Sequence, residues 1–375
     1  MKKLGLGLMR LPLIEENNSS KIDIEATKVM VDEFLDNGFN YFDTAWMYHS
    51  YESENAVKEV LTKRHKRDEF LLATKLHANY VKSLDDRDRI FSEQKEKTGV
   101  SYFDYYLLHD VREAHLAIYE KYDCFNWLIE KKKAGEVKNI GFSFHDNAEF
   151  LDKVLTKYPF VDFVQLQLNY LDWDNESIQS RLCYEVAEKH GKKVIVMEPV
   201  KGGTLAKLPE EAEAVLKNHN PEVSVPSWAI RFVALLPNVF MVLSGMSNLE
   251  QLRDNIKTMD NLTPLTKEEN RLIKEVVAII NKGAAIPCTG CSYCTDGCPQ
   301  KIAIPKYFEL YNAEMQEAEG KGWSPQIAYY ENMIKTFGKA SDCIGCGACE
   351  EVCPQNLPIT RYLKSIVKSF EEVEN

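Results

Sequence analysis

The chain has 375 residues, of which 45% are hydrophobic, enough for one large packed domain and a smaller one. Its net charge of -11 argues against nucleic acid or an anionic membrane surface as a partner, because both require a basic face. We expect no membrane segment, since no apolar stretch approaches the roughly 18 residues that span a bilayer. Arg10 and Pro12 interrupt the first apolar run, so a first strand is expected there and not a signal peptide.

Up to about residue 283, short β-branched and aromatic runs alternate with amphipathic helical patterns. Eight strands with helices between them predict an α/β fold, a (β/α)8 TIM barrel, over residues 1–283. A doubly wound sheet would need a Gly-rich phosphate loop after its first strand, and none is present. The predicted strands are 4–9, 39–43, 70–74, 103–108, 138–142, 161–168, 194–198 and 240–244, and the predicted helices include 23–37, 53–64, 123–134, 177–190, 227–236 and 249–256.

The pattern changes after Asn281-Lys282-Gly283, and residues 284–375 predict a small α-helical domain. We expect a first cysteine run, a long helical insert over about 304–337, a second cysteine run and a closing helix over 359–372. This tail is acidic. An acidic ferredoxin would therefore be repelled unless Lys335 and Lys339 form a local basic patch.

Eight of the ten cysteines form two copies of one run, C-x2-C-x2-C-x3-C-P. This spacing is typical of two [4Fe-4S] clusters in which the fourth cysteine of each run ligates the other run's cluster. Zinc sites would leave the third cysteine of each run unexplained, and disulfides suit small secreted domains. Cys124 and Cys183 lie outside the pattern and are expected to be small buried apolar residues. The predicted ligand sets are Cys288, Cys291, Cys294 and Cys353 for cluster 1, and Cys343, Cys346, Cys349 and Cys298 for cluster 2.

Four polar residues lie at the ends of three consecutive predicted barrel strands. Asp43 ends one strand, with Tyr48 five residues later, and Lys75 and His109 follow the next two strands. Barrel enzymes place their chemistry at the C-terminal ends of the strands, so all four are expected at one rim. A single Tyr or His there would most often be structural, but four with ordered spacing are hard to explain as packing.

These residues resemble the aldo-keto reductase superfamily, whose tetrad is an Asp, Tyr, Lys and His on the same strand ends. The resemblance covers about residues 1–260, and the cysteine-rich tail makes the whole similar to the iron-sulfur branch of that superfamily. It implies reversible carbonyl and alcohol chemistry with NAD(P)H on a small molecule. The residues expected to bind the cofactor are Ser143, Gln165, Met197, Pro199, Lys201, Gly202, Gly203, Ser244, Gly245, Gln251 and Asn255.

The tetrad also follows a chemical logic of its own. A phenol has a pKa near ~10, and an adjacent ammonium lowers it by stabilising the phenolate. Lys75 would supply that charge, and Asp43 would hold Lys75 in place. Tyr48 would then be the general acid in reduction and the base in oxidation, while His109 orients the substrate carbonyl.

The chain departs from the family pattern at the cofactor. Phe144 and His145 stand where the family has an Asn beside Ser143, and Met197 stands where an aromatic ring stacks on the nicotinamide. Members that bind NADPH carry a Lys and an Arg after the eighth strand for the 2′-phosphate. The matching positions here are Gly245 and Gln251, which favours NADH over NADPH.

The pairing of clusters with nicotinamide is chemically awkward, because a cluster passes single electrons and nicotinamide carries hydride. A flavin can do both, so FMN is an alternative cofactor, with its phosphate on Lys201-Gly202-Gly203 and near Gly245. We favour an oxidoreductase whose clusters relay electrons to a redox protein such as ferredoxin. The alternatives are a flavin reductase driven by ferredoxin electrons and a non-catalytic electron-transfer or redox-sensing subunit. Free thiols in cluster-binding runs predict a cytoplasmic location.

Overall fold

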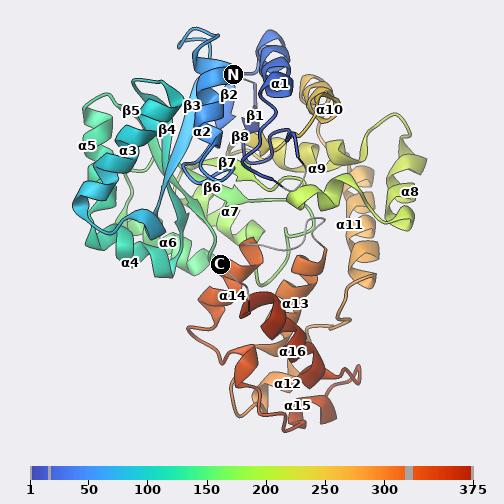
Figure 1. Ribbon diagram of the computed structural model, residues 1–375. Coiled ribbons are helices and arrows are strands. Elements are labelled where there is room, and N and C mark those ends of the chain that lie inside the picture. Colours follow the sequence, from blue (N-terminus) through green and yellow to red (C-terminus); the bar gives the residue numbers. More distant parts are fainter. Residues whose placement is uncertain (1, 16–17, 317–323, 373–375) are drawn as a thin grey trace.

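The computed structural model describes residues 2–15, 18–316 and 324–372, and its larger part is a closed barrel of eight parallel strands (Figure 1). The strands follow one another in sequence order, and β1 pairs with β8 to close the barrel. The predicted (β/α)8 barrel is confirmed, with β3 and β4 each running three residues further than predicted. The strands are β1 (Leu4–Gly7), β2 (Tyr41–Asp43), β3 (Leu71–His77), β4 (Phe103–Val111), β5 (Val137–Phe144), β6 (Phe163–Gln167), β7 (Lys193–Met197) and β8 (Val239–Ser244).

Side chains fill the interior of the barrel. At Gly141 on β5 a Cβ atom would lie 2.4 Å from the backbone oxygen of Phe163, so only glycine lets β5 and β6 approach this closely. The register pairs His77 with His109 and Ser143 with Gln165 at the C-terminal end of the barrel. The packed interior comprises Tyr41, Ala73, Leu107, Phe163, Ile195, Met241 and Leu243.

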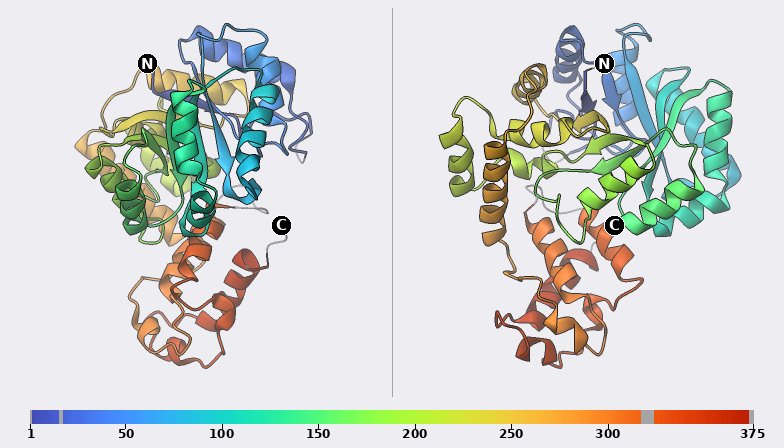
Figure 2. Two further views of the ribbon diagram at one scale, coloured as in Figure 1. Left: turned by 90° about the vertical axis from the view of Figure 1, so that its left-hand side faces the viewer. Right: turned by 180° about the vertical axis from the view of Figure 1, so that it is seen from behind.

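Helices surround the barrel on its outside (Figure 2). Asp23 caps α1 by accepting a hydrogen bond from the backbone N–H of Ala26, and Thr266 with Glu269 forms a capping box on α11. The helix predicted over 53–64 begins as an α-helix and continues as a π-helix over Lys58–Thr62. The helices are α1 (Ile24–Asp36), α2 (Ser53–Val57), α3 (Leu84–Thr98), α4 (Glu113–Lys121), α5 (Cys124–Lys133), α6 (Ala148–Lys157), α7 (Ser180–Lys189), α8 (Glu210–His219), α9 (Val225–Ala234), α10 (Leu249–Asp260) and α11 (Lys267–Lys282), with 3-10 turns at Ala78–Tyr80 and Lys201–Ala206.

The tail forms a small helical domain with its own core, as predicted. The helical insert predicted over about 304–337 contains two helices, α13 and α14, and residues 317–323 lie outside the described ones. Pro325 occupies the first turn of α14, the position in a helix where its missing N–H costs nothing. The tail elements are α12 (Tyr293–Asp296), α13 (Ile304–Met315), α14 (Pro325–Met333), a 3-10 turn at Ala340–Asp342, α15 (Ala348–Glu351) and α16 (Ile359–Phe370). None of the helices in the described parts of the chain is both long and apolar enough to cross a membrane.

The tail docks on the C-terminal rim of the barrel, below it in Figure 1, with α13 and α14 next to the rim. It contacts the loops that follow four consecutive strands, β4 to β7. The contacts are Arg112 with Glu331, Glu113 with Lys335 (3.3 Å), the backbone oxygen of His145 with Asn332 (2.9 Å), Ser177 with Glu309 (2.5 Å) and Thr204 with the backbone oxygen of Gln316 (2.5 Å).

Candidate active site and cluster sites

The four residues predicted from the strand ends meet at the barrel rim. Lys75 Nζ donates hydrogen bonds to Asp43 Oδ1 at 2.5 Å and to Tyr48 OH at 3.3 Å. The His109 ring meets the Tyr48 ring edge-on, with 6.0 Å between their centroids. Asp43 and Lys75 are buried, whereas Tyr48 and His109 keep part of their surface accessible. The ion pair therefore lies beneath a phenol and an imidazole that a substrate can reach.

The pKa of Tyr48 differs from the prediction that Lys75 would lower it. Burial raises the pKa of Tyr48 above its usual value, and the favourable charge of Lys75 only partly offsets this. Burial alone would lower the pKa of Lys75, but Asp43 and Tyr48 raise it, so Lys75 is an ammonium. Burial and the neighbouring His77 and Lys75 hold the pKa of His109 well below its usual range. The protein thus presents a protonated phenol and a neutral imidazole.

A second layer of buried residues supports Lys75. Gln94 Nε2 donates to the backbone oxygen of Lys75 and to Glu54 Oε1, both at 3.0 Å. The hydroxyl of Thr74 donates to the same Glu54 oxygen at 2.7 Å. Burial raises the pKa of Glu54 to about 7. The sequence contains no signal that Glu54 and Gln94 support Lys75, because only the fold brings them behind the strand that carries Lys75.

The residues predicted to hold the nicotinamide carboxamide lie side by side on β5 and β6. Ser143 Oγ accepts the backbone N–H of Asp110 at 2.8 Å. Gln165 Nε2 points at Met197 Sδ, 3.5 Å away, and Gln165 Oε1 is buried with no hydrogen-bond partner among the described residues. A buried amide oxygen without a donor fits a carboxamide NH2 group, so the residues present suit nicotinamide.

In the predicted phosphate loop after β7, the N–H groups that would bind a phosphate donate to other groups of the protein. Lys201 is fully buried, and its ammonium donates to Asp172 Oδ1 at 2.6 Å. The backbone N–H of Gly202 donates to Glu198 Oε2 at 2.7 Å, and that of Gly203 to Val200 O at 3.1 Å. The structure therefore gives no support to a phosphate at this loop. The sequence carried no signal for Asp172 as the partner of Lys201.

The residues predicted at the end of β8 and on α10 form a small cluster next to the β7 loop in the barrel order. Asn255 donates to Ser244 Oγ at 2.7 Å, and the exposed Gln251 accepts the backbone N–H of Ser247 at 2.8 Å. A Cβ atom on Gly245 would lie 3.1 Å from Cδ of Arg10. The side chain of Arg10 thus packs over the glycine and brings a cation next to position 245.

The eight clustered cysteines line two separate hollows in the tail. Each hollow holds three thiols from one run and the fourth thiol of the other run. Cys124 and Cys183 are buried elsewhere, and burial raises the pKa of Cys124 to about 12, so neither is a reactive thiolate. The first hollow is lined by Cys288, Cys291, Cys294 and Cys353, and the second by Cys298, Cys343, Cys346 and Cys349.

A groove of about 820 Å³ runs between the barrel and the cluster hollows. It is lined by Asp172 and Glu176 of the loop after β6, by α11, and by Cys288 and Cys298, one from each hollow.

The Lys335 ammonium faces Glu113 of the barrel at 3.3 Å. Lys335 is therefore part of the contact between the domains, while its role in a basic patch with Lys339 for a redox partner stays a prediction.

Comparison with known proteins identifies the class. Residues 3–278 match the model of the aldo/keto reductase family, and residues 287–357 match that of a 4Fe-4S dicluster domain. The chain belongs to the aldo/keto reductase family and carries a 4Fe-4S dicluster domain at its C-terminal side. The protein is an oxidoreductase.

Individual relatives are distant. An uncharacterized oxidoreductase of Bacillus subtilis, YqkF, is 24% identical over 304 residues, which cover 73% of this chain and 92% of that protein. The holo form of the aldo-keto reductase AKR11C1 from Bacillus halodurans has a TM-score of 0.59 at 24% identity, covering 73% of this chain and 91% of that one. An aldo-keto reductase from Klebsiella pneumoniae, solved in complex with NADPH, has a TM-score of 0.56 at 17% identity, with 73% and 90% covered. These solved structures share the fold of the barrel.

Proposed function

We propose that the protein interconverts a small carbonyl compound and its alcohol, with Tyr48 as the proton donor and acceptor. The observation that carries this proposal is the buried Asp43–Lys75 pair, whose ammonium lies 3.3 Å from the Tyr48 hydroxyl. A nicotinamide supplies the hydride when it is bound. The chain's own residues supply the proton, the orientation and the exclusion of water.

The roles follow from the protonation states. In reduction, Tyr48 gives its proton to the carbonyl oxygen, and Lys75 stabilises the phenolate that results. Asp43 holds the ammonium in place and balances its charge in the barrel interior. The neutral His109 offers a hydrogen bond to the carbonyl oxygen and fixes its direction toward Tyr48. In oxidation the same groups act in reverse order.

The clusters are proposed to relay single electrons between the barrel and a redox protein such as ferredoxin. Cluster 1 would be held by Cys288, Cys291, Cys294 and Cys353, and cluster 2 by Cys343, Cys346, Cys349 and Cys298; in each set four thiols line one hollow. The division into a barrel over 1–283 and a cluster domain over 284–375 stays a prediction, as does a cytoplasmic location. The contacts of the tail with the catalytic rim support a relay toward the barrel mouth.

For the nucleotide we propose NADH, because positions 245 and 251 lack the cations that hold a 2′-phosphate in NADPH-binding relatives. Arg10 is the residue that weighs against this choice, since its side chain packs over Gly245. The ratio of kcat/KM for NADH to that for NADPH decides the matter. A ratio above 1 that stays the same in Arg10→Met would support NADH. A ratio below 1 that rises above 1 in Arg10→Met would show that Arg10 binds the 2′-phosphate of NADPH.

The alternative is a flavin-dependent reductase driven by ferredoxin electrons. The groove beside Cys288 and Cys298 favours it, because its volume lies in the range of cofactor sites and it touches both cluster hollows. Flavin absorbance in anaerobically prepared protein, after removal of the clusters, would support this reading. Protein without flavin that still oxidises NAD(P)H with a carbonyl substrate would exclude it. Intact clusters without turnover in either assay would leave a non-catalytic electron-transfer subunit.

The main experiment is anaerobic oxidation of NAD(P)H with a panel of small aldehydes and ketones. Loss of the Tyr48 hydroxyl in Tyr48→Phe should lower the rate by about 10² to 10⁴. Tyr51→Phe is the matched control, because Tyr51 is a neighbouring phenol that is 39% exposed and whose hydroxyl donates a hydrogen bond to Tyr80 OH. Equal rates in the wild-type protein and Tyr48→Phe would refute the proposed role of Tyr48.

A further inference from the structure

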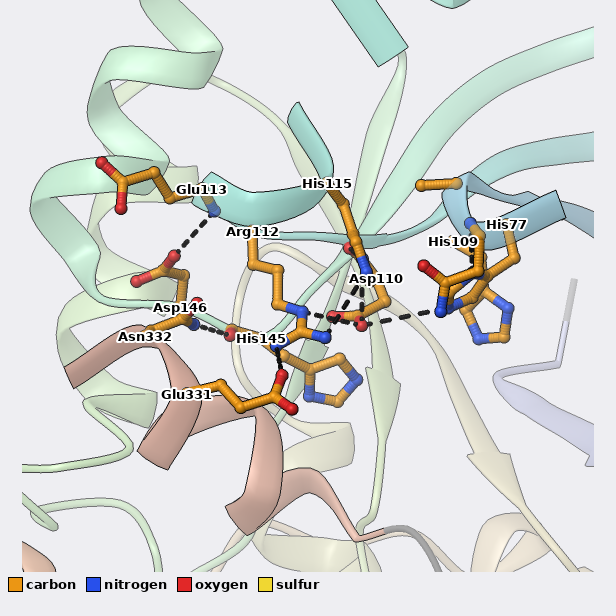
Figure 3. Close-up of polar contacts among 12 residues, drawn as sticks. His77, His109, Asp110, Arg112, Glu113, His115, His145, Asp146, Glu331 and Asn332 are labelled. Atoms are coloured by element: carbon orange, nitrogen blue, oxygen red, sulfur yellow. Dashed lines mark hydrogen bonds and ion pairs between the residues drawn. The ribbon is translucent and has the colours of Figure 1, made fainter. Parts of the chain in front are cut away.

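A group of histidines and acids lies beside the proposed catalytic His109 (Figure 3). His77, Asp110 and His115 bring ligand atoms within 4.8 Å of one another, the spacing of a metal site. The hydrogen bonds argue against that reading. His77 Nδ1 accepts the backbone N–H of Asn79 at 3.1 Å, and His115 Nδ1 donates to the backbone oxygen of Asp110 at 2.8 Å.

These two hydrogen bonds fix the positions of the ring protons. In the neutral His77 the proton is on Nε2, the nitrogen that faces Asp110 at 4.0 Å. In His115 the proton is on Nδ1, which lies 3.2 Å from Asp110 Oδ2. The nitrogens nearest the carboxylate therefore carry protons, and a metal needs lone pairs there. The cluster is a carboxylate surrounded by N–H groups and not a metal site.

The carboxylate of Asp110 anchors an unusual stretch of backbone. Asp110 directly follows His109 and has a φ of 55°, a left-handed conformation that is strained for a residue with a side chain. This conformation lets the Asp110 N–H donate to Ser143 Oγ at 2.8 Å. Asp110 thus ties the strand end that carries His109 to the residue expected to hold the nicotinamide.

The anchor extends to the cluster domain through Arg112. Its Nε lies 3.1 Å from Asp110 Oδ2, and its Nη1 donates to Glu331 on α14. Arg112 is 6% exposed and Asp110 3%, so water screens this pair weakly. In the turn that follows α14, Lys335 meets Glu113 at 3.3 Å, but that pair is more exposed, and no contact of either residue with Asp110 or His109 is present among the described residues.

We propose that the cluster domain is a working part of the barrel active site, with Arg112 as a positioning residue. Docked α14 holds Arg112 through Glu331, Arg112 holds Asp110, and Asp110 fixes His109 and Ser143. This inference rests on the proposed function, because it counts His109 as the group that orients the carbonyl. Removing the contact should therefore impair a hydride reaction in which the clusters themselves take no part.

The test compares Glu331→Gln with Lys335→Met in the full-length protein with both clusters. Both variants remove one charge from the same domain contact, but only the first reaches Asp110. We expect Glu331→Gln to lower kcat for NAD(P)H-driven carbonyl reduction by about tenfold to a hundredfold with little change in KM. Lys335→Met should stay within about twofold of the wild-type protein.

A second readout does not depend on turnover. Hydrogen exchange of the peptide that covers residues 107–116, followed by mass spectrometry, should speed up in Glu331→Gln and not in Lys335→Met. Visible absorbance checks that both variants keep their clusters. Exchange and kcat that are the same in the two variants would overturn the proposal. Faster exchange in a protein that reduces no carbonyl would uphold the coupling and refute the proposed function instead.

Discussion

At the scale of single residues, the proposed role of Tyr48 predicts how the reaction depends on pH. Burial raises its pKa above the usual value, so the phenol stays protonated through neutral pH. Reduction uses this protonated form and should show a flat kcat/KM between about pH 6 and 9. Oxidation uses the phenolate and should become faster as the pH rises. A kcat/KM for reduction that falls tenfold per pH unit above 7 would contradict this assignment.

Glu54 makes stability depend on pH. Its pKa is about 7 in the folded protein and lies near the ordinary value of 4.5 when the chain is unfolded, so the folded state binds the extra proton between these values. The free energy of unfolding should therefore fall as the pH rises from about 4.5 through 7, by about 3 kcal/mol in all. Glu54→Gln keeps an acceptor for Thr74 and Gln94 and removes the titration.

The measurement is urea unfolding of the wild-type protein and Glu54→Gln at pH 5 and pH 8 under anaerobic conditions. The free energy of unfolding of Glu54→Gln, relative to that of the wild-type protein, should be higher at pH 8 than at pH 5. Glu52→Gln is the control, because Glu52 is an exposed neighbour whose carboxylate accepts a hydrogen bond from the Asn55 side chain. A difference between the proteins that is the same at both pH values would rule out the titration of Glu54.

The sequence revealed the residues with a family pattern and missed those that support them. Asp43, Tyr48, Lys75 and His109 were predictable because each lies at or near the C-terminal end of a recognisable strand. Asp172 and Glu331 gave no signal, because their partners Lys201 and Arg112 lie 29 and 219 positions away in the chain. Such pairs form only after the barrel closes and the tail docks, so no local pattern encodes them.

At the scale of elements, Gly338 holds the two cysteine runs together. It pairs with Ile302 in an isolated bridge, and a Cβ atom there would lie 2.0 Å from the backbone oxygen of Gln300. Gly338→Ala should therefore separate the runs and lower the iron content of the protein. Gly297→Ala is the control, since a Cβ atom at Gly297 would meet nothing within 4 Å. Full iron content in both variants would show that this bridge is dispensable.

The same scale shows where periodicity was a sufficient guide. All eight strands were predictable, because eight short β-branched runs that alternate with helices are typical of a (β/α)8 barrel. The insert between the cysteine runs was expected to be helical, since its residues have helical spacing. Pro325 starts the second of its helices. The π-helix over Lys58–Thr62 had no signal in the spacing of apolar residues.

At the scale of the whole molecule, the tail covers part of the catalytic rim and touches the loops after β4 to β7 (Figure 2). Sequence alone predicted two domains but gave no information on their arrangement, because the contacts are single polar pairs between distant loops. The arrangement joins a domain with two cysteine hollows to the rim of the proposed active site, with α12 and α15 at the end of the tail away from the barrel (Figure 1). Whether electrons or hydride reach the substrate is therefore the central question about this protein.

Transfer of deuterium from the nucleotide answers it most directly. Anaerobic protein with both clusters is given NADH or NADPH labelled with deuterium at the transferred position, together with a reducible aldehyde, in ordinary water. Our account predicts that each alcohol molecule carries one deuterium on its carbinol carbon and that Tyr48→Phe forms about 10² to 10⁴ times less product. Unlabelled alcohol, formed at the same rate in Tyr48→Phe, would mean that the hydrogen comes from solvent through another carrier and would contradict the account.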